Sequence, residues 1–90
     1  MSGYPPVSPR PELPEEFRFL CMLHNVGAIN IDRSLSVEEI SKWTDKENSI
    51  IQEHLRKLEE LGYVQSVKSD GPEKYHVSVT GIRKVLTLYS

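Results

Sequence analysis

The chain has 90 residues, of which 38% are hydrophobic and 27% charged, and its formal net charge is −2 at pH 7. This length allows one folded domain with a thin core, and the composition excludes a disordered chain. The single cysteine excludes an intrachain disulfide, and no apolar stretch approaches the ~20 residues of a membrane span. Because no signal-peptide pattern is present either, we expect a cytoplasmic protein without a membrane partner.

The charge is divided unevenly along the chain. Residues 1–41 carry 3 basic and 6 acidic side chains, whereas residues 42–90 carry 8 and 7, so the two parts have charges of −3 and +1. Because contact with phosphate requires positive charge, the second part is the better candidate for binding nucleic acid. The negative total leaves a protein partner as the alternative.

Residues 1–14 form a proline-rich segment, which holds Pro5, Pro6, Pro9, Pro11 and Pro14. Proline fixes φ and removes a hydrogen-bond donor, so the segment is predicted to be an extended arm that packs on its own domain or on a second subunit. The spacing of Pro6 and Pro9 also fits a peptide ligand for an SH3-like domain. The predicted organisation is an arm over residues 1–14 and one domain over residues 15–90.

The first predicted helix begins with Pro14 at its first position, followed by two acidic residues, and Gly27 is its expected end. A stripe that recurs at i, i+3, i+4 and i+7 is predicted to be buried on it, and consists of Phe17, Leu20, Cys21 and His24. In this setting Cys21 is expected to be a packed thiol and His24 a partly buried helix residue. Residues 28–31 are predicted to form a short edge strand.

Two capping-box patterns predict two helices joined by a tight turn. Ser36 with Glu39 opens the second helix, on which Val37, Ile40 and Trp43 follow at helical spacing. Thr44 with Glu47 repeats the pattern eight residues later. The third helix is predicted over about residues 46–61, ended by Gly62, with an inward face formed by Ile51, Leu55, Leu58 and Leu61.

The remainder of the chain predicts a hairpin and a last helix. Residues 63–68 are the first strand and residues 69–72 the turn. On the second strand, one face is expected to be buried and consists of Tyr75, Val77 and Val79, with His76 and Ser78 on the other face. Thr80 is expected to cap a helix with one shared face formed by Ile82, Val85, Leu86 and Tyr89. The fold class is therefore mainly α with a small β-hairpin (α+β).

The segment at residues 51–64, IQEHLRKLEELGYV, resembles the third helix and first wing strand of winged helix-turn-helix proteins, through the pattern HL-x-x-L-E-x-x-G-Y-V. It is similar to regulators of the MarR, ArsR and PadR types, and Val79-Thr80-x-x-Arg83 matches their junction between strand and last helix. The resemblance covers about residues 15–89 and implies a three-helix core, a wing and a C-terminal helix. Asp45 occupies the turn where these proteins usually have glycine or a small residue.

This resemblance implies a transcription regulator whose helix at 46–61 enters the DNA major groove, with the hairpin at 63–79 as its wing. Its donors and acceptors for base edges would be Asn48, Ser49, Gln52, Glu53 and Arg56. Its phosphate contacts would come from Lys42, Lys46 and Lys57, from Lys68 and Lys74 beside the wing turn, and from Arg10 on the arm. The alternative is a solvated helix face, on which Arg56 and Lys57 pair with Gln52 and Glu53 one turn back.

A thin core favours a homodimer, for which the apolar candidates are Phe17, Leu86, Leu88 and Tyr89. The three histidines lack the spacing of a metal site, and no nucleophile with a base can be assembled, so we expect neither a metal, nor a cofactor, nor an enzyme. The alternative function is a winged-helix module that binds another protein without binding DNA. Ile50, on the exposed side of the third helix, is compatible with that alternative.

Overall fold

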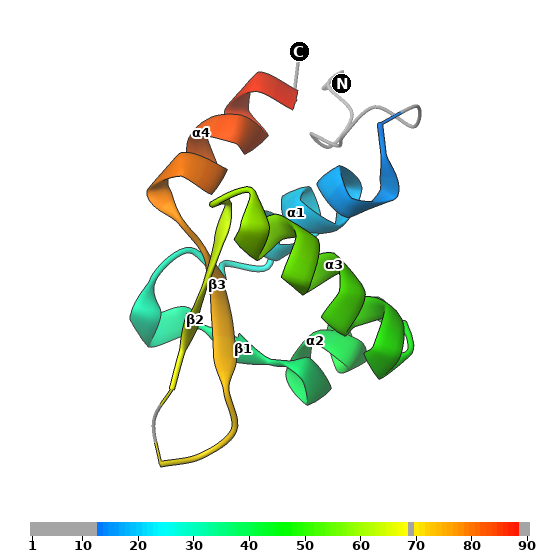
Figure 1. The fold of residues 1–90 in the computed structure, drawn as a ribbon, viewed down its shortest axis with the longest axis vertical. Coiled ribbons are helices and arrows are strands. Elements are labelled where there is room, and N and C mark those ends of the chain that lie inside the picture. The colour runs from blue at the N-terminus through cyan, green and yellow to red at the C-terminus, as the bar shows by residue number, and fades with distance from the viewer. Residues whose placement is uncertain (1–12, 69, 89–90) are drawn as a thin grey trace, which may run out of the picture.

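The computed structural model describes residues 13–68 and 70–88, so residues 1–12 of the predicted arm and Tyr89 lie outside the described residues. The elements follow in the order α1 (Glu15–Asn25), the 3-10 turn η1 (Ile31–Arg33), β1 (Leu35–Ser36), α2 (Val37–Thr44), α3 (Asn48–Glu60), β2 (Val64–Val67), β3 (Lys74–Val77) and α4 (Val79–Leu88) (Figure 1). The strands form an antiparallel sheet in the order β1-β3-β2. The predicted class of helices with a small hairpin is confirmed, and β1 adds a third strand to the hairpin.

The core lies between α1, α2, α3, the sheet and α4. Each helix contributes apolar side chains that recur every three or four residues, so one face of each is buried. The fully buried side chains include Leu20, Leu23, Ile40, Ile51, Leu55, Leu58, Val64, Val77 and Val85. Cys21 is also fully buried and His24 is partly buried, which confirms both predictions. Burial of one such aliphatic side chain contributes ~1.5–3 kcal/mol, so these residues supply most of the apolar driving force.

Two helices end in the same way, at the two glycines that the sequence predicts as stops. Gly27 and Gly62 have φ values of +93° and +82°, a region that other residues rarely adopt. The amide of each glycine donates to the carbonyl three residues back, and the next amide donates five residues back, from Ala28 to Leu23 and from Tyr63 to Leu58. Leu61, which was predicted to be in the core, is 52% exposed because it lies at this terminus, where the chain leaves the helix.

The predicted strand at residues 28–31 is wrong. The turn at Gly27 is followed by a 3-10 turn, which Asn30 begins by accepting a hydrogen bond from the Arg33 amide at 3.0 Å. This segment makes one backbone hydrogen bond to β3, in which the Ala28 carbonyl accepts from the Val77 amide at 2.7 Å. The strand forms further along the chain, at Leu35–Ser36, where it pairs with β3.

The beginnings of α1 and α4 also differ from prediction by a few residues. Pro14 precedes α1 as its cap residue, with an extended ψ of 147°, and its carbonyl accepts from the Phe17 and Arg18 amides. The last helix begins at Val79, and its cap is Ser78 rather than Thr80, because the Ser78 hydroxyl accepts from the Gly81 amide at 3.0 Å.

Ser78 has a second role that explains why the predicted alternation of β3 is wrong. Its hydroxyl donates to the Gly62 carbonyl at 2.6 Å, and its amide donates to the Tyr63 carbonyl at 2.9 Å. These bonds turn Ser78 inward and end the strand at Val77, so Val79 is 68% exposed on the new helix. His76, which was expected on the open face, is buried as well. One serine therefore fixes the end of α3 against the beginning of α4.

Candidate nucleic-acid interface

The second helix begins at the predicted capping box. The Ser36 amide donates to the Glu39 carboxylate at 2.9 Å, and the Glu39 amide donates to the Ser36 hydroxyl at 3.2 Å. The hydrogen bonds from Ser36 hold the pKa of Glu39 below its usual range, and the nearby charges of Lys74 and Lys42 lower it further. Because Ser36 is also paired with Lys74 in the sheet, this cap fixes α2 relative to the wing.

The turn between α2 and α3 is held by two hydroxyl groups of α2. Asp45 occupies the left-handed region with φ of +60°, the conformation that usually favours glycine. The Thr44 hydroxyl donates to the Ile40 carbonyl at 2.9 Å and accepts from the Lys46 amide at 3.3 Å, while the Ser41 hydroxyl donates to the Lys46 carbonyl at 2.8 Å. The predicted Thr44–Glu47 capping box is therefore wrong. Helix α3 begins at Asn48 rather than near Lys46, and no side chain caps it.

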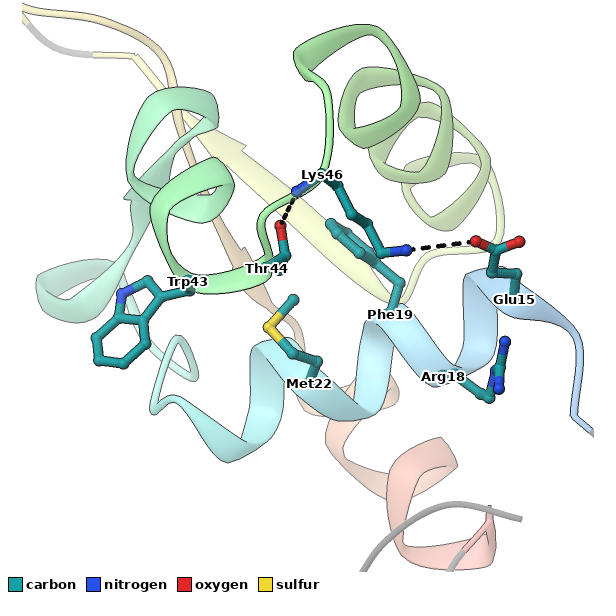
Figure 2. A pocket seen from close by; sticks show the side chains of 7 residues that line it. All are labelled: Glu15, Arg18, Phe19, Met22, Trp43, Thr44 and Lys46. Carbon is teal, nitrogen blue, oxygen red and sulfur yellow. Dashed lines mark hydrogen bonds and ion pairs between the residues drawn. The ribbon is translucent and has the colours of Figure 1, made fainter. Parts of the chain in front are cut away.

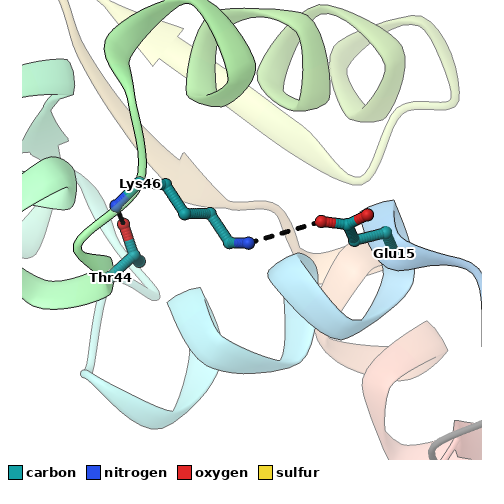
Figure 3. A network of polar contacts seen from close by, with 3 residues as sticks. All are labelled: Glu15, Thr44 and Lys46. Carbon is teal, nitrogen blue, oxygen red and sulfur yellow. Dashed lines mark hydrogen bonds and ion pairs between the residues drawn. The ribbon is translucent and has the colours of Figure 1, made fainter.

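Lys46 connects this turn to the first helix. Its ammonium group lies 3.4 Å from the Glu15 carboxylate, while its backbone amide is bonded to Thr44 (Figure 3). The Lys46 side chain is partly buried by this arrangement. Of the lysines predicted to meet phosphate, Lys46 is thus already paired with an acid, whereas Lys42 and Lys57 are exposed.

The polar residues predicted on α3 share one exposed side of the helix. The opposite side is buried and contains Ile51, His54, Leu55 and Leu58. All the predicted base-contact residues are exposed, namely Asn48, Ser49, Gln52, Glu53 and Arg56. A helix anchored on one side and carrying donors and acceptors on the other has the shape that a major groove admits.

The charges on this side of α3 are mixed. Arg56 lies 3.4 Å from the Glu60 carboxylate, one turn forward, rather than pairing with Gln52 or Glu53 one turn back. From Asn48 to Glu60 the helix carries two basic and three acidic side chains, which gives a charge of −1. The acids include Glu59 and Glu60 at the C-terminal end, so the N-terminal turns are the less acidic part of the helix.

The wing is the turn between β2 and β3, and it extends from the end of the sheet away from α4 (Figure 1). Val67 pairs with Lys74 at its base, so Lys68 and Lys74 lie on either side of the turn, as predicted. Lys68 is exposed, whereas Lys74 is half-buried and acts on Glu39. Of the two predicted wing lysines, Lys68 is therefore the more accessible.

The apolar dimer candidates lie in different environments. Phe17 packs edge-on against Tyr63, with ring centroids 6.2 Å apart, and the Lys84 ammonium lies 5.1 Å from the centre of its ring. Leu88 is buried in the core of its own chain, and Leu86 is exposed.

Among the residues that the structure describes, no cluster of three or more potential metal ligands occurs. Nor is any helix within the described ranges long and apolar enough to cross a membrane.

The fold defined by these elements is the winged helix-turn-helix fold, which the chain shares with the solved structures described below. Residues 28–66, from the end of α1 to the first wing strand, match the sequence model of the family described as bacterial regulatory protein, arsR family. A comparison with curated proteins gave no match.

Solved structures with the same fold include two TubR proteins. TubR from Bacillus megaterium pBM400 has a TM-score of 0.70 at 19% identity, over 82% of this chain and 83% of that chain. The DNA-binding TubR fragment from Clostridium botulinum has a TM-score of 0.70 at 20% identity, over 81% of this chain and 91% of that chain. A MarR family protein from Bacillus stearothermophilus has a TM-score of 0.67 at 22% identity, and the match covers 88% of this chain but 52% of that one.

Two features of the site were missed in the sequence analysis. The hydroxyls of Ser41 and Thr44 fix the turn, whereas the sequence predicted only Thr44 to be involved, as part of a capping box with Glu47. Trp43 was assigned the spacing of an inward residue and is 63% exposed. A helix of eight residues has room for few buried positions, and Ile40 is the one that α2 buries. The short length of α2 was therefore the sequence feature that could have indicated the exposure of Trp43.

Proposed function

We propose that this chain binds duplex DNA as a transcription regulator, with α3 in the major groove and the β2–β3 wing beside it. The observation that carries the proposal is the two-sided α3, with its apolar side buried and the polar side from Asn48 to Arg56 exposed. The regulator family that matches residues 28–66 supports it, and so does the fold shared with the DNA-binding TubR fragment from Clostridium botulinum.

Within this proposal the residues have distinct roles. Asn48 and Gln52 can pair with adenine, Arg56 with guanine, and Glu53 can accept from cytosine, while the hydroxyl of Ser49 can serve either partner. Lys42, Lys57, Lys68 and Lys74 would meet phosphates. Lys46 would do so only by exchanging its Glu15 partner for a phosphate, at little cost because such exposed pairs contribute ~1 kcal/mol or less.

We further propose a homodimer, since one domain of this size offers a short interface to DNA. Leu86 is the predicted candidate that is exposed for such a contact, and Val79 lies two turns before it on α4, at a spacing of seven residues. The recognition helices of two subunits would then meet half-sites ~34 Å apart. The predicted cytoplasmic location belongs to the same proposal.

The test is a mobility-shift titration of the full chain on a pool of random duplexes at low salt, followed by selection of the retained sequences. Retention of duplex, with an affinity that falls steeply as salt rises, would support the proposal. Failure to retard any duplex at low salt would refute it. If duplexes are retained, selection among them would identify an operator, on which the variants considered below can be tested.

The alternative is a winged-helix module that binds a protein. The charge of −1 along α3 favours it, because an acidic helix is repelled by phosphate. Recovery of one stoichiometric protein partner, together with no retention of DNA, would support this alternative and exclude the regulator.

A further inference from the structure

A groove runs between α1 and the α2–α3 turn, and of the residues proposed to contact DNA it includes only Lys46. Its volume is about 380 Å³, and Figure 2 shows its lining. Phe19 and Met22 of α1 form the apolar part, Trp43 of α2 stands at one end, and Glu15 with Lys46 stands at the other. The exposed apolar surface of the groove thus comes from Trp43 and Met22, since Phe19 is 2% exposed, and the charged groups lie at the end formed by Glu15 and Lys46.

Trp43 is the only tryptophan of the chain, and 63% of it is exposed. It borders a second shallow hollow with Glu39 and Lys42, so its ring stands between two depressions. Within the described residues, neither its indole N–H nor the guanidinium of Arg18 donates a hydrogen bond to a protein group. The groove therefore offers an aromatic surface flanked by donors that have no acceptor in the described part of the chain.

This combination fits a polyproline II segment. Such a helix has no internal hydrogen bonds, so its carbonyls accept from donors such as an indole N–H, and its proline rings pack on aromatic side chains. Because the segment is extended before it binds, ordering it costs less entropy than ordering a flexible peptide. An apolar groove with aromatic and donor groups is the common receptor for this kind of ligand.

We propose that the groove binds the proline-rich arm of the same chain, residues 1–12. This segment contains Pro5, Pro6, Pro9 and Pro11, and it leads through Leu13 and Pro14 into Glu15, which lines one end of the groove. From Glu15 to Met22 the groove follows eight residues of α1, a rise of ~10 Å along the helix axis. At ~3.1 Å per residue, four residues of polyproline II span that length, and the arm has enough residues for a reversal before it. This inference does not depend on DNA binding.

The test uses the fluorescence of Trp43, to which no other tryptophan contributes. In the full chain, the triple variant Pro5→Ala/Pro6→Ala/Pro9→Ala removes the ring contacts and the preformed extended conformation. Its emission is expected to shift to longer wavelength than in the wild type, and its quenching by acrylamide is expected to increase. Pro72→Ala, at an exposed position in the wing turn, is the matched control and should leave both signals unchanged.

Two results would overturn the proposal. Identical emission and quenching in the wild type, the triple variant and the control would show that the arm does not cover Trp43. Protection of Trp43 that appears only as the protein concentration is raised would show that a second copy supplies the arm. Far-ultraviolet circular dichroism of the triple variant should be that of the wild type in helix content, which separates loss of arm contact from loss of fold.

Discussion

The ring of His54 lies against the ring of Phe19, with centroids 5.1 Å apart and planes inclined by 37°. This contact joins α3 to α1 beneath the proposed DNA-binding side. His54 is 8% exposed, and its Nε2 is buried without a hydrogen-bond partner among residues 13–68 and 70–88. A buried polar atom left unsatisfied costs ~1–3 kcal/mol. The packing of the His54 ring therefore stabilises the folded state, whereas its unbonded Nε2 destabilises it.

His54→Leu is therefore expected to leave the free energy of unfolding unchanged or to raise it by ~1 kcal/mol. Leucine keeps most of the packed volume and removes the unsatisfied nitrogen. His54→Ala leaves a cavity against Phe19 and is expected to lower the free energy of unfolding by ~2–4 kcal/mol. Urea unfolding followed by circular dichroism measures both. A loss of 2 kcal/mol or more in His54→Leu would mean that Nε2 has a partner that stabilises the fold.

Gly81 lies where α4 approaches the beginning of β2 most closely. A Cβ placed there would overlap the Tyr63 carbonyl and approach Cγ1 of Val77 to 2.7 Å. Gly81→Ala is expected to lower the free energy of unfolding by ~1–3 kcal/mol, because the neighbouring carbonyl belongs to the backbone and cannot rotate away. Gly71→Ala in the wing, where a Cβ meets nothing within 4 Å, is the control and should change it by ~0.5 kcal/mol or less. Equal effects of the two variants would contradict the close packing of α4.

The contrast between these elements explains which parts of the fold could be predicted. The capping box at Ser36 and the stops at Gly27 and Gly62 depend on residues within one helical turn, and the sequence indicated each of them correctly. Ser78 was assigned to the open face because its partners, Gly62 and Tyr63, are 15 or more residues away. The prediction of a strand at residues 28–31 was wrong for a related reason. Pairing with β3 depends on where a segment lies in the fold, and not on the apolar character of these four residues.

The candidate site divides in the same way. Exposure of the polar side of α3 follows from its helical period, so the predicted base-contact residues are all at the surface. The pairs that modify the site, Lys46 with Glu15 and Arg56 with Glu60, could not be assigned. The first joins residues 31 apart in sequence, and the second is one of several pairings that the spacing along α3 allows.

The Ser36–Glu39 capping box predicts a dependence of stability on pH. The folded state lowers the pKa of Glu39 from 4.5, so its contribution is complete well above pH 4.5 and is lost as the pH falls through the lower folded-state value. Glu39→Gln keeps the capping hydrogen bond but does not titrate. The difference in free energy of unfolding between wild type and Glu39→Gln should therefore shrink on acidification. Glu38→Gln removes the same charge from the same turn outside the box, and its difference from wild type should change less over that range. If the two variants behave alike, the box does not couple stability to pH.

The ion pair of Arg56 and Glu60 is expected to affect the affinity of the protein for the operator DNA that selection would identify. Arg56 lies on the exposed side of α3, where it can reach guanine, but its guanidinium is 3.4 Å from the Glu60 carboxylate. Arg56→Ala is expected to weaken binding roughly 5- to 150-fold, the range for a lost contact to guanine.

Glu60→Gln releases Arg56 and removes a negative charge from the helix, so it is expected to strengthen operator binding by roughly 1.5- to 5-fold, the scale of an exposed ion pair. The double variant, Arg56→Ala with Glu60→Gln, completes a cycle that separates these two effects. If Glu60 acts by holding Arg56, the gain from Glu60→Gln should shrink once Arg56 is absent. If it acts only by repelling phosphate, the gain should be the same in both backgrounds and should decline as salt is raised. An unchanged affinity in Glu60→Gln at low salt would exclude both effects of Glu60, and Arg56→Ala alone would then decide whether Arg56 contacts DNA.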